Sequence, residues 1–372
     1  YTFDEHFGRP IGSYPPRAVL WDYIKGRVEK ADVRKYVRFN SAVRHVEFHP
    51  DSKQFSVTVH NHVTDEMYTE TFDFVVVASG HFSTPKIPEY EGFGSFGGRI
   101  LHAHDFRDAL EFKGKNVLLV GSSYSAEDIG SQCYKYGAKQ IISCYRSSPM
   151  GYHWPENWSE RPQLLRVDQT HAYFADGSSA EIDAIILCTG YLHSFPFMSE
   201  SLRLKTDNIL YPLHLYQGVV WEANPQLFYL GMQDQWYSFN MFDAQAWYAR
   251  DVMLGKIALP SFAEMQADTQ AWHEQEKTLQ AAAAMFKFQG DSIMRLIDQT
   301  DYPSFDIEAV RLTFLQWKKH KQENIMAFRD NTYRSLMAGT MATPHHTPWI
   351  DALDDSLEAY LQTEANLQQK AG

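Results

Sequence analysis

Residues 116–133 read Asn-Val-Leu-Leu-Val-Gly-Ser-Ser-Tyr-Ser-Ala-Glu-Asp-Ile-Gly-Ser-Gln-Cys. The apolar run at 116–120 predicts a buried strand, and the glycine- and serine-rich residues 121–125 predict a tight turn. Beyond the turn, small and apolar residues recur at the spacing of one helix face, at Ala126, Ile129, Gly130 and Cys133. Gly137 is typical of a helix end, and 140–145 predict the next strand. The run therefore indicates an α/β fold with a strand–turn–helix–strand unit.

The turn itself carries Gly121-x-Ser123-x-x-Ala126, a degenerate form of the glycine pattern that binds dinucleotides. In that pattern the first glycine makes the tight turn, the second small residue lets a pyrophosphate approach, and the third permits close helix–strand packing. We therefore expect Gly121 and the residues after it to cradle a pyrophosphate at the helix N-terminus, namely Ser122, Ser123, Tyr124 and Ser125. An ordinary strand-to-helix turn is the alternative.

The end of the next strand favours one coenzyme over the other. An NAD site places a carboxylate there to accept a hydrogen bond from the ribose. This strand instead ends Cys144-Tyr145-Arg146-Ser147-Ser148, and the next acidic residue is Glu156. Arg146 offers a guanidinium and Ser147 a hydroxyl for a 2′-phosphate, so the sequence predicts NADP(H). The alternative is that Arg146 is an exposed surface arginine.

One pattern occurs twice, about 110 residues apart. An alternating hairpin around residues 36–59 precedes a buried strand at 74–78 that ends Ser79-Gly80-His81. A second hairpin around 171–177 precedes a strand at 184–188 that ends Thr189-Gly190-Tyr191. The repetition predicts two duplicated nucleotide-binding domains.

The 372 residues (43.0 kDa) suggest two or three domains. With 34 basic and 46 acidic residues the net charge is −12, which argues against nucleic acid or a membrane surface as partner. No apolar run is long enough for a membrane span. Three cysteines without paired spacing predict small buried side chains and a reducing, cytoplasmic compartment, and we expect no metal site. The chain begins at Tyr1, without Met or a signal-like segment, and no strand–turn–helix unit precedes the first hairpin, so we expect it to be part of a longer polypeptide.

The segment after Pro260 is predicted to be helical. Ser261-x-x-Glu264 is a capping box, and the alanines at 281–284 are expected to continue a helical tract. A further helix is predicted from about Asp306 past Phe328. Within it the basic run at 318–321 is expected to be a solvated helix face rather than a binding patch.

A second motif, Phe96-x-Gly98-x-x-x-His102-x-x-x-Phe106, resembles the fingerprint of flavin-containing monooxygenases and their Baeyer–Villiger relatives. The paired strand ends at Gly80 and Gly190 resemble those of the same family, as does the segment 227–261. Within the family, 121–128 and 231–236 look most like the bacterial trimethylamine-oxidising members. The family also carries an N-terminal FAD-binding glycine motif that this chain does not contain.

The resemblance implies a flavoprotein with FAD and NADPH Rossmann-like domains, the FAD domain being N-terminally incomplete, and a C-terminal helical region. On that basis 1–107 would be the FAD-domain remainder and linker, 108–219 the NADPH domain, and 220–372 the return to the FAD domain and the helical region. The implied NADP contacts include Thr189 and Gly190. The implied FAD contacts are Val43, Ser79, Gly80, Gln233 and Asp234, and Tyr124 and Asp234 would act in catalysis. The alternatives are a core strand valine for Val43, a structural carboxylate that satisfies backbone donors for Asp234, and a surface turn tyrosine for Tyr124.

The implied activity is NADPH- and FAD-dependent oxygenation of soft nucleophiles through a C4a-hydroperoxyflavin, with trimethylamine to its N-oxide as the first expectation. Other amines, sulfides and indole are further expected substrates, with molecular oxygen as co-substrate. Two alternatives stay open, a Baeyer–Villiger monooxygenase of the same fold and a catalytically silent NADP-binding fragment. Large apolar side chains after Ser261 predict a homodimer interface there, unless they only cover the parent domain. They are Trp272, Met285, Phe286, Phe314, Trp317, Phe328 and Trp349.

Overall fold

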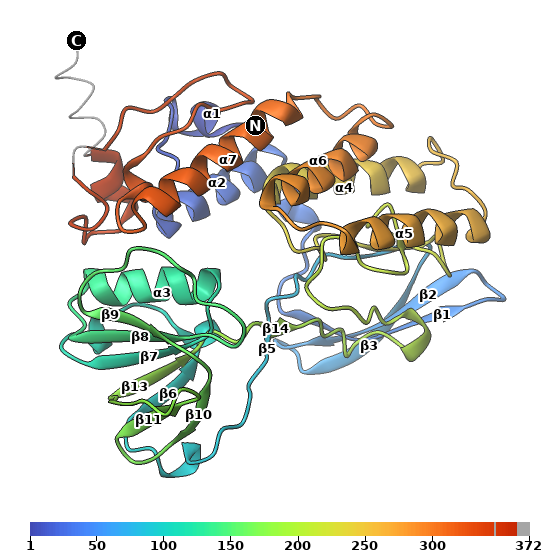
Figure 1. Cartoon of the computed structure of the whole chain (residues 1–372). Helices are drawn as coiled ribbons and strands as arrows, with labels where there is room; N and C mark the ends of the chain where they lie inside the picture. Colours follow the sequence, from blue (N-terminus) through green and yellow to red (C-terminus); the bar gives the residue numbers. More distant parts are fainter. Residues whose placement is uncertain (346, 363–372) are drawn as a thin grey trace. The chain divides into compact units, whose positions relative to one another are not determined.

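The computed structural model describes residues 1–345 and 347–362. The chain forms two compact units, each assembled from segments that lie far apart in the sequence. The first unit contains 1–34, 85–190 and 315–372, and the second contains 35–84 and 191–314. Each unit is described by itself below, with the element labels of Figure 1.

The first unit is built on a five-stranded, wholly parallel sheet in the order β6-β13-β7-β8-β9. Its strands are β6 (Arg99–His102), β13 (Ala184–Leu187), β7 (Asn116–Val120), β8 (Gln140–Cys144) and β9 (Trp158–Arg161). Helix α3 (Tyr124–Lys135) lies along one face of this sheet (Figure 1). The α/β class and the strand–turn–helix–strand unit predicted at 116–145 are confirmed.

Alternation along β7 explains the layers of this unit. Val117 and Leu119 pack toward α3, together with Ala126 and Cys133. Leu118 and Val120 point to the other face, where they meet a small antiparallel sheet. That sheet contains β10 (Leu164–Val167), β11 (His171–Phe174) and β12 (Ser179–Glu181). The unit is therefore a helix layer, a parallel sheet and an antiparallel sheet.

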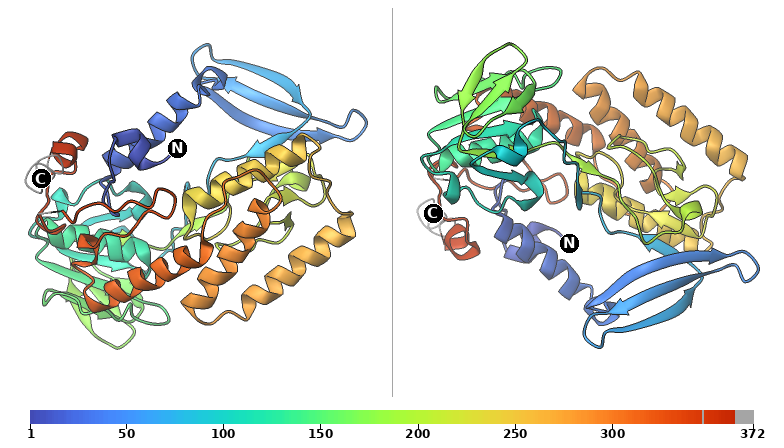
Figure 2. Two further views of the ribbon diagram at one scale, coloured as in Figure 1. Left: turned by 90° about the horizontal axis from the view of Figure 1, so that it is seen from above. Right: turned by 90° about the horizontal axis from the view of Figure 1, so that it is seen from below.

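The second unit repeats this order of layers. A four-stranded sheet contains β15 (Leu215–Tyr216), β16 (Val220–Trp221), β17 (Leu227–Tyr229) and β4 (Val75–Val77). Leu227 and Tyr229 of β17 pack toward an antiparallel sheet, whereas Phe228 packs toward helices. The antiparallel sheet contains β1 (Ser41–His49), β2 (Gln54–Asn61) and β3 (Glu66–Phe72), and Figure 2 shows it as a long ribbon in both views. A hairpin precedes a strand in each unit, as predicted, but the expectation of a buried strand at 74–78 is wrong. Strand β4 lies at the edge of its sheet, and Phe74 and Val76 are 37% and 39% exposed.

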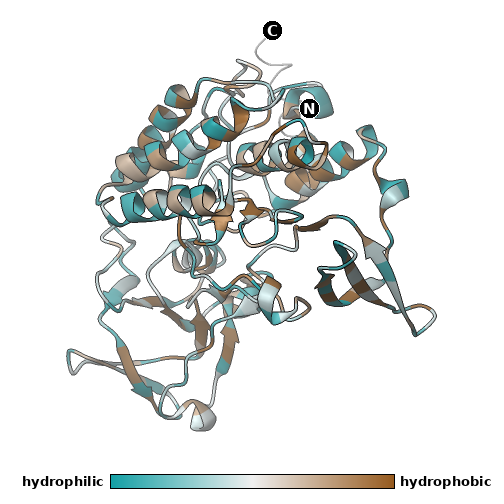
Figure 3. Ribbon diagram, turned by 90° about the vertical axis from the view of Figure 1, so that its right-hand side faces the viewer, coloured by the Kyte–Doolittle hydropathy of each residue, from teal (hydrophilic) through white to brown (hydrophobic). Residues whose placement is uncertain are grey.

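The helices of the second unit are α4 (Ser238–Met253), α5 (Phe262–Lys277), α6 (Ala282–Ile297) and the first turns of α7 (Ile307–Glu323). In Figure 3 these helices carry mixed brown and teal residues, while many strand residues are brown. That contrast is expected because an amphipathic helix buries one face, whereas strands are rich in β-branched and aromatic residues. The remaining elements are α1 (Phe3–Phe7), α2 (Arg17–Lys30), β5 (Thr84–Pro85), β14 (Tyr191–Leu192) and short 3-10 turns at 34–36, 93–95, 103–105, 110–112, 200–202 and 328–330.

Two predicted helix boundaries are wrong. The capping box at Ser261 and Glu264 is present, but α5 ends at Lys277 instead of continuing through the alanines. Two backbone N–H groups, of Leu210 and Tyr211, donate to the carboxylate of Glu276 at 2.7 and 2.9 Å. Leu279 then turns into an apolar cluster with the same two residues. Tertiary packing thus overrides the helix propensity of residues 278–281, and the helix resumes with α6 at Ala282.

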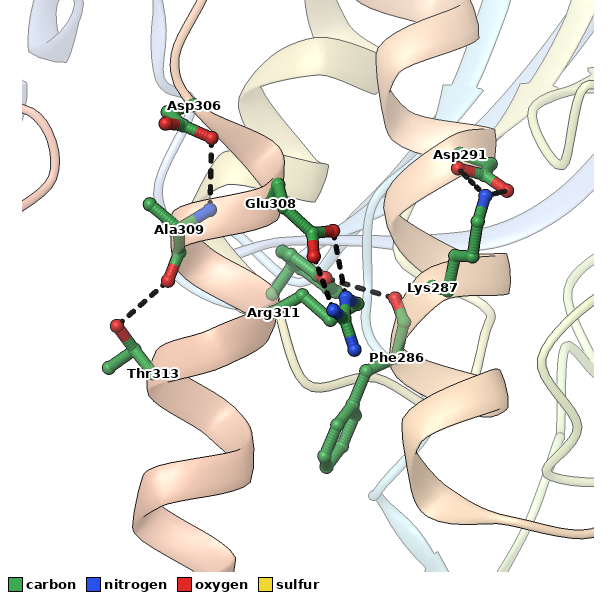
Figure 4. A network of polar contacts seen from close by, with 9 residues as sticks. Phe286, Lys287, Asp291, Asp306, Glu308, Ala309, Arg311 and Thr313 are labelled. Atoms are coloured by element: carbon green, nitrogen blue, oxygen red, sulfur yellow. Dashed lines mark hydrogen bonds and ion pairs between the residues drawn. The ribbon is translucent and has the colours of Figure 1, made fainter.

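Helix α7 ends at Glu323, before the predicted end beyond Phe328. The side chain of Asn324 accepts hydrogen bonds from Met326 and Ala327 N–H at 3.1 and 3.2 Å, which closes a turn in place of the next helical turn. Figure 4 shows the opposite end of α7, where the Asp306 carboxylate accepts from Ala309 N–H at 2.9 Å. Within residues 1–345 and 347–362, no helix combines the length and apolar character needed to cross a membrane.

Candidate functional site

The carboxyl ends of β7, β8 and β13 meet at one edge of the parallel sheet. Val120 lies in register with Cys144 on one side and with Leu187 on the other. The three segments that leave these strands begin at Gly121, Tyr145 and Cys188, so most of the predicted NADP residues gather at this edge. In open α/β sheets, ligands bind at such a carboxyl edge.

Gly121 shows why the turn needs glycine. Its φ is +135°, and its N–H donates to Cys144 O at 2.9 Å. A Cβ on Gly121 would lie 2.3 Å from Cys188 O, far inside van der Waals contact. The bare backbone therefore leads directly into α3, which begins at Tyr124 with Ser123 in extended conformation as N-cap. Fully buried Ala126 sets the close packing of α3 on the sheet, as the glycine pattern predicts.

Arg146 and Ser147 are exposed directly after β8, at the same edge. The Ser122 hydroxyl donates to Ser148 O at 3.3 Å, which ties the glycine turn to the Arg146 loop. The Arg146 guanidinium is thus placed where a 2′-phosphate beside a pyrophosphate on α3 could be reached. The residues at this edge fit a bound NADP(H).

Thr189 and Gly190 also lie at this edge, and their hydrogen bonds fix the segment around Lys86. The Thr189 hydroxyl donates to Lys86 O at 2.5 Å, and Lys86 N–H donates to Gly190 O at 2.9 Å. Gly190 has φ +79° and Gly80, its counterpart in the second unit, has φ +72°. Both strand ends therefore make the same left-handed turn, which glycine adopts without strain.

The Phe96–Phe106 motif brings β6 to the edge of the parallel sheet. A Cβ on Gly98 would lie 2.2 Å from Asp183 O, so glycine is required for β6 to pair with β13. Phe96 packs against the cluster on one face of the sheet and Phe106 against the cluster on the other. His102 is buried, its Nδ1 accepts from His104 N–H at 3.0 Å, and burial lowers its pKa. These contacts give the motif a structural role.

Tyr124 is the first residue of α3 and its side chain is about half exposed, at 49%. Its ring centroid lies 6.3 Å from that of Trp317 on α7, and the Lys321 ammonium lies 4.8 Å from the Tyr124 ring. The ring of Tyr124 is therefore half exposed beside the turn that begins at Gly121, and its contact with a coenzyme stays a prediction. Trp317 and Lys321 were not among the predicted site residues, and the basic run at 318–321 is not a uniformly solvated face, because Lys321 is buried.

In the second unit, β4 and β17 are parallel, so Ser79 and Gly80 leave the sheet at the same edge as Gly231. Ser79 and Gly80 are exposed, and Gly231 has φ +73°. Ser79 and Gly80 are the residues at this strand end that are predicted to contact FAD. The exposed backbone at this edge fits a ligand that approaches the sheet closely.

Gln233 and Asp234 follow on the same segment. The Gln233 side chain is buried, donates to Gly218 O at 2.7 Å and accepts from Gln245 Nε2 at 3.0 Å. Asp234 is half-buried, and its main chain is fixed by Ile209 O, to which its N–H donates at 2.8 Å, and by Gln289 Nε2, which donates to its O at 2.6 Å. Gln233 therefore holds the chain in place with its side chain. The Asp234 carboxylate accepts from Gln235 N–H at 3.1 Å, a backbone contact of the kind that the structural alternative predicts.

Val43 lies on β1, next to an irregularity in its pairing with β2, and its side chain is 40% exposed. The alternative of a core strand valine is therefore wrong. The contact of its backbone with a flavin stays a prediction.

His81 and His193 form a stacked pair that sequence reasoning missed. Their ring centroids are 4.4 Å apart with an interplanar angle of 8°. His81 Nδ1 contacts Gly231 O at 3.0 Å and His193 Nε2 contacts Met232 O at 3.1 Å, so each ring donates to a carbonyl after β17. Burial lowers the pKa of both, and the neighbouring His193 lowers the pKa of His81 further.

Most of the aromatic side chains after Ser261 pack inside their own unit. Phe286 and Phe328 are buried, Trp272 stacks on Tyr211 at 5.3 Å, and Phe314 packs with Tyr237. The aromatic-rich stretch 236–242 combines buried and partly exposed side chains, and Tyr237 and Met241 are the ones in the core.

The three cysteines are buried and free, and burial raises the pKa of Cys133 to about 12 and of Cys144 to about 11.

The family model for flavin-binding monooxygenase-like proteins matches residues 1–153 and 158–312. The trimethylamine monooxygenase of Roseovarius nubinhibens is 60% identical over 363 residues, which cover 97% of this chain and 81% of the relative. The trimethylamine monooxygenase of Methylocella silvestris is 58% identical, with 97% and 80% covered. The crystal structure of Tmm from a Pelagibacter species superimposes with a TM-score of 0.95 at 49% identity, covering 97% of this chain and 81% of that chain.

Proposed function

The chain belongs to the flavin-binding monooxygenase-like family, and from that membership we propose that it uses NADPH and FAD to oxygenate small amines, trimethylamine first. Molecular oxygen would be the co-substrate. The substrate class follows the names of relatives that are 49–60% identical over 97% of the chain. The observation that carries the coenzyme assignment is the turn at Gly121, with the exposed Arg146 at the same edge.

The residues of this chain would divide the work as follows. The backbone of 121–125 and the N-terminus of α3 would bind the pyrophosphate of NADPH, and Arg146 with Ser147 would bind its 2′-phosphate. Tyr124 would contact the nicotinamide half and keep water from the reacting atoms. Exposed Ser79 and Gly80, the backbone around Gln233 and Asp234, and Val43 would contact FAD. When bound, the flavin supplies the redox and oxygen chemistry that side chains cannot.

The direct test is a spectrum and a product assay. We expect the purified full chain, incubated with FAD and then desalted, to retain flavin absorption and to form trimethylamine N-oxide when NADPH, oxygen and trimethylamine are supplied. Flavin retention without amine oxygenation, but with oxygen insertion into a cyclic ketone, would favour Baeyer–Villiger chemistry. NADP⁺ binding without flavin retention would favour a silent NADP-binding module.

The coenzyme preference has its own test in Arg146→Ala. Loss of a charge-assisted contact to phosphate costs about 1.5–3 kcal/mol, which corresponds to about 10- to 150-fold weaker NADPH binding. We expect NADH binding to change little, because NADH lacks the 2′-phosphate. Arg99→Ala is the matched control, since Arg99 begins β6 at the opposite edge of the same sheet and is 53% exposed. Equal weakening of both coenzymes would show that Arg146 contacts another part of the molecule.

We also propose that the protein is a homodimer and acts in the cytoplasm. The compartment rests on three free, buried cysteines, which fit a reducing environment. Exposed apolar side chains after Ser261 support an interface, since Phe262, Leu312 and Leu353 are 50–55% exposed.

A further inference from the structure

Lys321 is a lysine whose position is unusual for its type. It is the last residue of the basic run 318–321 on α7, yet it is 2% exposed. Its ammonium donates to Glu127 Oε2 at 2.6 Å, and Glu127 is itself 4% exposed. Fully buried lysines and glutamates are rare unless they are paired. The two residues lie 194 positions apart in the sequence, both within the first unit.

Aromatic rings surround the Lys321 ammonium. It lies 4.7 Å from the ring centroid of Trp317, 4.8 Å from Tyr124, 5.5 Å from Phe328 and 5.6 Å from Tyr152. These distances are within the range of cation–π attraction, which is strongest where the cation is desolvated. The ammonium therefore contacts Tyr124 and Glu127 together, and these two residues are one turn apart on α3.

The charge of Glu127 matters because of where α3 begins. Glu127 lies in the first turn of the helix whose N-terminus would hold a pyrophosphate. A lone carboxylate there would oppose the negative charge of the phosphates. Burial raises the pKa of Glu127, and Lys321 opposes that shift by stabilising the carboxylate. The ion pair leaves this turn without net charge from the two side chains.

We propose that Lys321 is a positioning residue for the coenzyme site: it neutralises Glu127 and holds the ring of Tyr124, so that the first turn of α3 accepts a pyrophosphate. The inference rests on the proposed function, since it requires that a dinucleotide binds at Gly121. It adds a residue from the distant α7 to the coenzyme site. Lys321 acts through Glu127 and Tyr124 and has no assigned contact with substrate.

The test measures binding of NADP⁺ and NAD⁺ to the full chain by quenching of tryptophan fluorescence, so it needs no turnover. Lys321→Met leaves the Glu127 charge uncompensated, and we expect about tenfold weaker binding of both coenzymes, because the pyrophosphate is common to them. Lys321→Met combined with Glu127→Gln removes both charges, and its affinity should return to within about threefold of the wild type. The matched control is Lys319→Met, since Lys319 is 72% exposed on the same helix.

Several outcomes would overturn the proposal. Wild-type coenzyme affinity in a folded Lys321→Met variant would contradict it. An equal loss of affinity in the single and double variants would also contradict it, because a purely structural role of Lys321 predicts no rescue by Glu127→Gln. If Lys321→Met does not fold, Lys321→Arg decides: affinity within about threefold of wild type supports the charge role, and tenfold loss contradicts it. If the wild type binds neither coenzyme, the proposed function fails and this inference with it, whereas binding that is insensitive to all variants refutes only the inference.

Discussion

Tyr124 is the side chain for which location and proposed role agree most directly. It opens α3 beside the glycine turn and is 49% exposed, so its removal should not disturb the core. We predict that Tyr124→Ser lowers the N-oxide formed per NADPH oxidised from near one to below about one half, because water then reaches the reacting atoms. The measurement compares product with NADPH consumption, alongside a melting curve.

The control for that variant is Tyr36→Ser, which removes a tyrosine that is 77% exposed in the other unit. Unchanged coupling in a stable Tyr124→Ser protein would assign Tyr124 to a structural role.

The stacked histidines predict how stability depends on pH. In the unfolded chain, histidine rings become protonated near their ordinary pKa of 6.5. In the folded protein the pKa values of His81 and His193 are lower, so both rings stay neutral to lower pH. The unfolded state therefore binds more protons below pH 6.5, and the free energy of unfolding should fall as the pH drops through that value. Each ring contributes at most about 1.4 kcal/mol per pH unit.

Urea unfolding at pH 7.5 and 5.5 checks this dependence. His193→Gln keeps a donor for Met232 O and removes one titrating ring. Between pH 7.5 and 5.5 its free energy of unfolding should therefore fall less than that of the wild type. His45→Gln serves as control, because the His45 side chain is half exposed on β1. An identical pH dependence in all three proteins would contradict the expectation.

Residues could be predicted from the sequence where their role follows from local pattern. Gly121 belongs to a short motif whose spacing carries its own physical reason, and its φ of +135° fits the predicted tight turn. The contact of Arg146 with a 2′-phosphate stays a prediction. Lys321 could not be predicted, because its partner Glu127 is 194 residues away and a basic run is usually solvated. The His81–His193 stack also joins distant positions, and only the folded chain brings them together.

At the scale of elements, the pairing of β6 with β13 depends on Gly98. A Cβ at this position would lie 2.2 Å from the backbone oxygen of Asp183, which cannot move without disturbing β13. We predict that Gly98→Ala lowers the free energy of unfolding of the protein by about 1–3 kcal/mol. Gly94→Ala is the matched control, since the position has open space around its Cβ and no positive φ. Chemical denaturation of both variants gives the comparison.

A loss of stability for Gly98→Ala no larger than that for Gly94→Ala would show that β6 can shift at little cost.

The boundaries of helices and strands could be predicted from the sequence only where local pattern decides them. Strand 116–120 was predicted to the residue, because an apolar run bounded by polar and glycine residues leaves little choice. The break between α5 and α6 was missed, since it depends on Glu276 binding the backbone of Leu210 and Tyr211.

At the scale of the whole molecule, the repeat of hairpin and strand could be predicted, whereas the exposure of β4 and the composition of the units could not. The repeat follows from local hydrophobic patterns, and a hairpin followed by a strand forms in each unit. The units, however, join segments from the beginning, middle and end of the chain. Such long-range assembly depends on packing between distant segments, which a single sequence does not display. The assignment of 1–107, 108–219 and 220–372 to cofactors stays a prediction.

The oligomeric state is the remaining prediction at this scale. Because Phe286 and Phe328 are buried within their own units, a dimer interface in the C-terminal region has to use other side chains, and Phe262 and Leu312 are 50% and 53% exposed. We expect light scattering at micromolar concentration to give twice the chain mass of 43.0 kDa, and Phe262→Asp with Leu312→Asp to shift the mass toward one chain. Leu110→Asp, at a site that is 63% exposed in the other unit, should leave the dimer intact. A wild-type mass of one chain would contradict the dimer proposal. If the Phe262→Asp, Leu312→Asp variant stays dimeric, the interface lies on another surface.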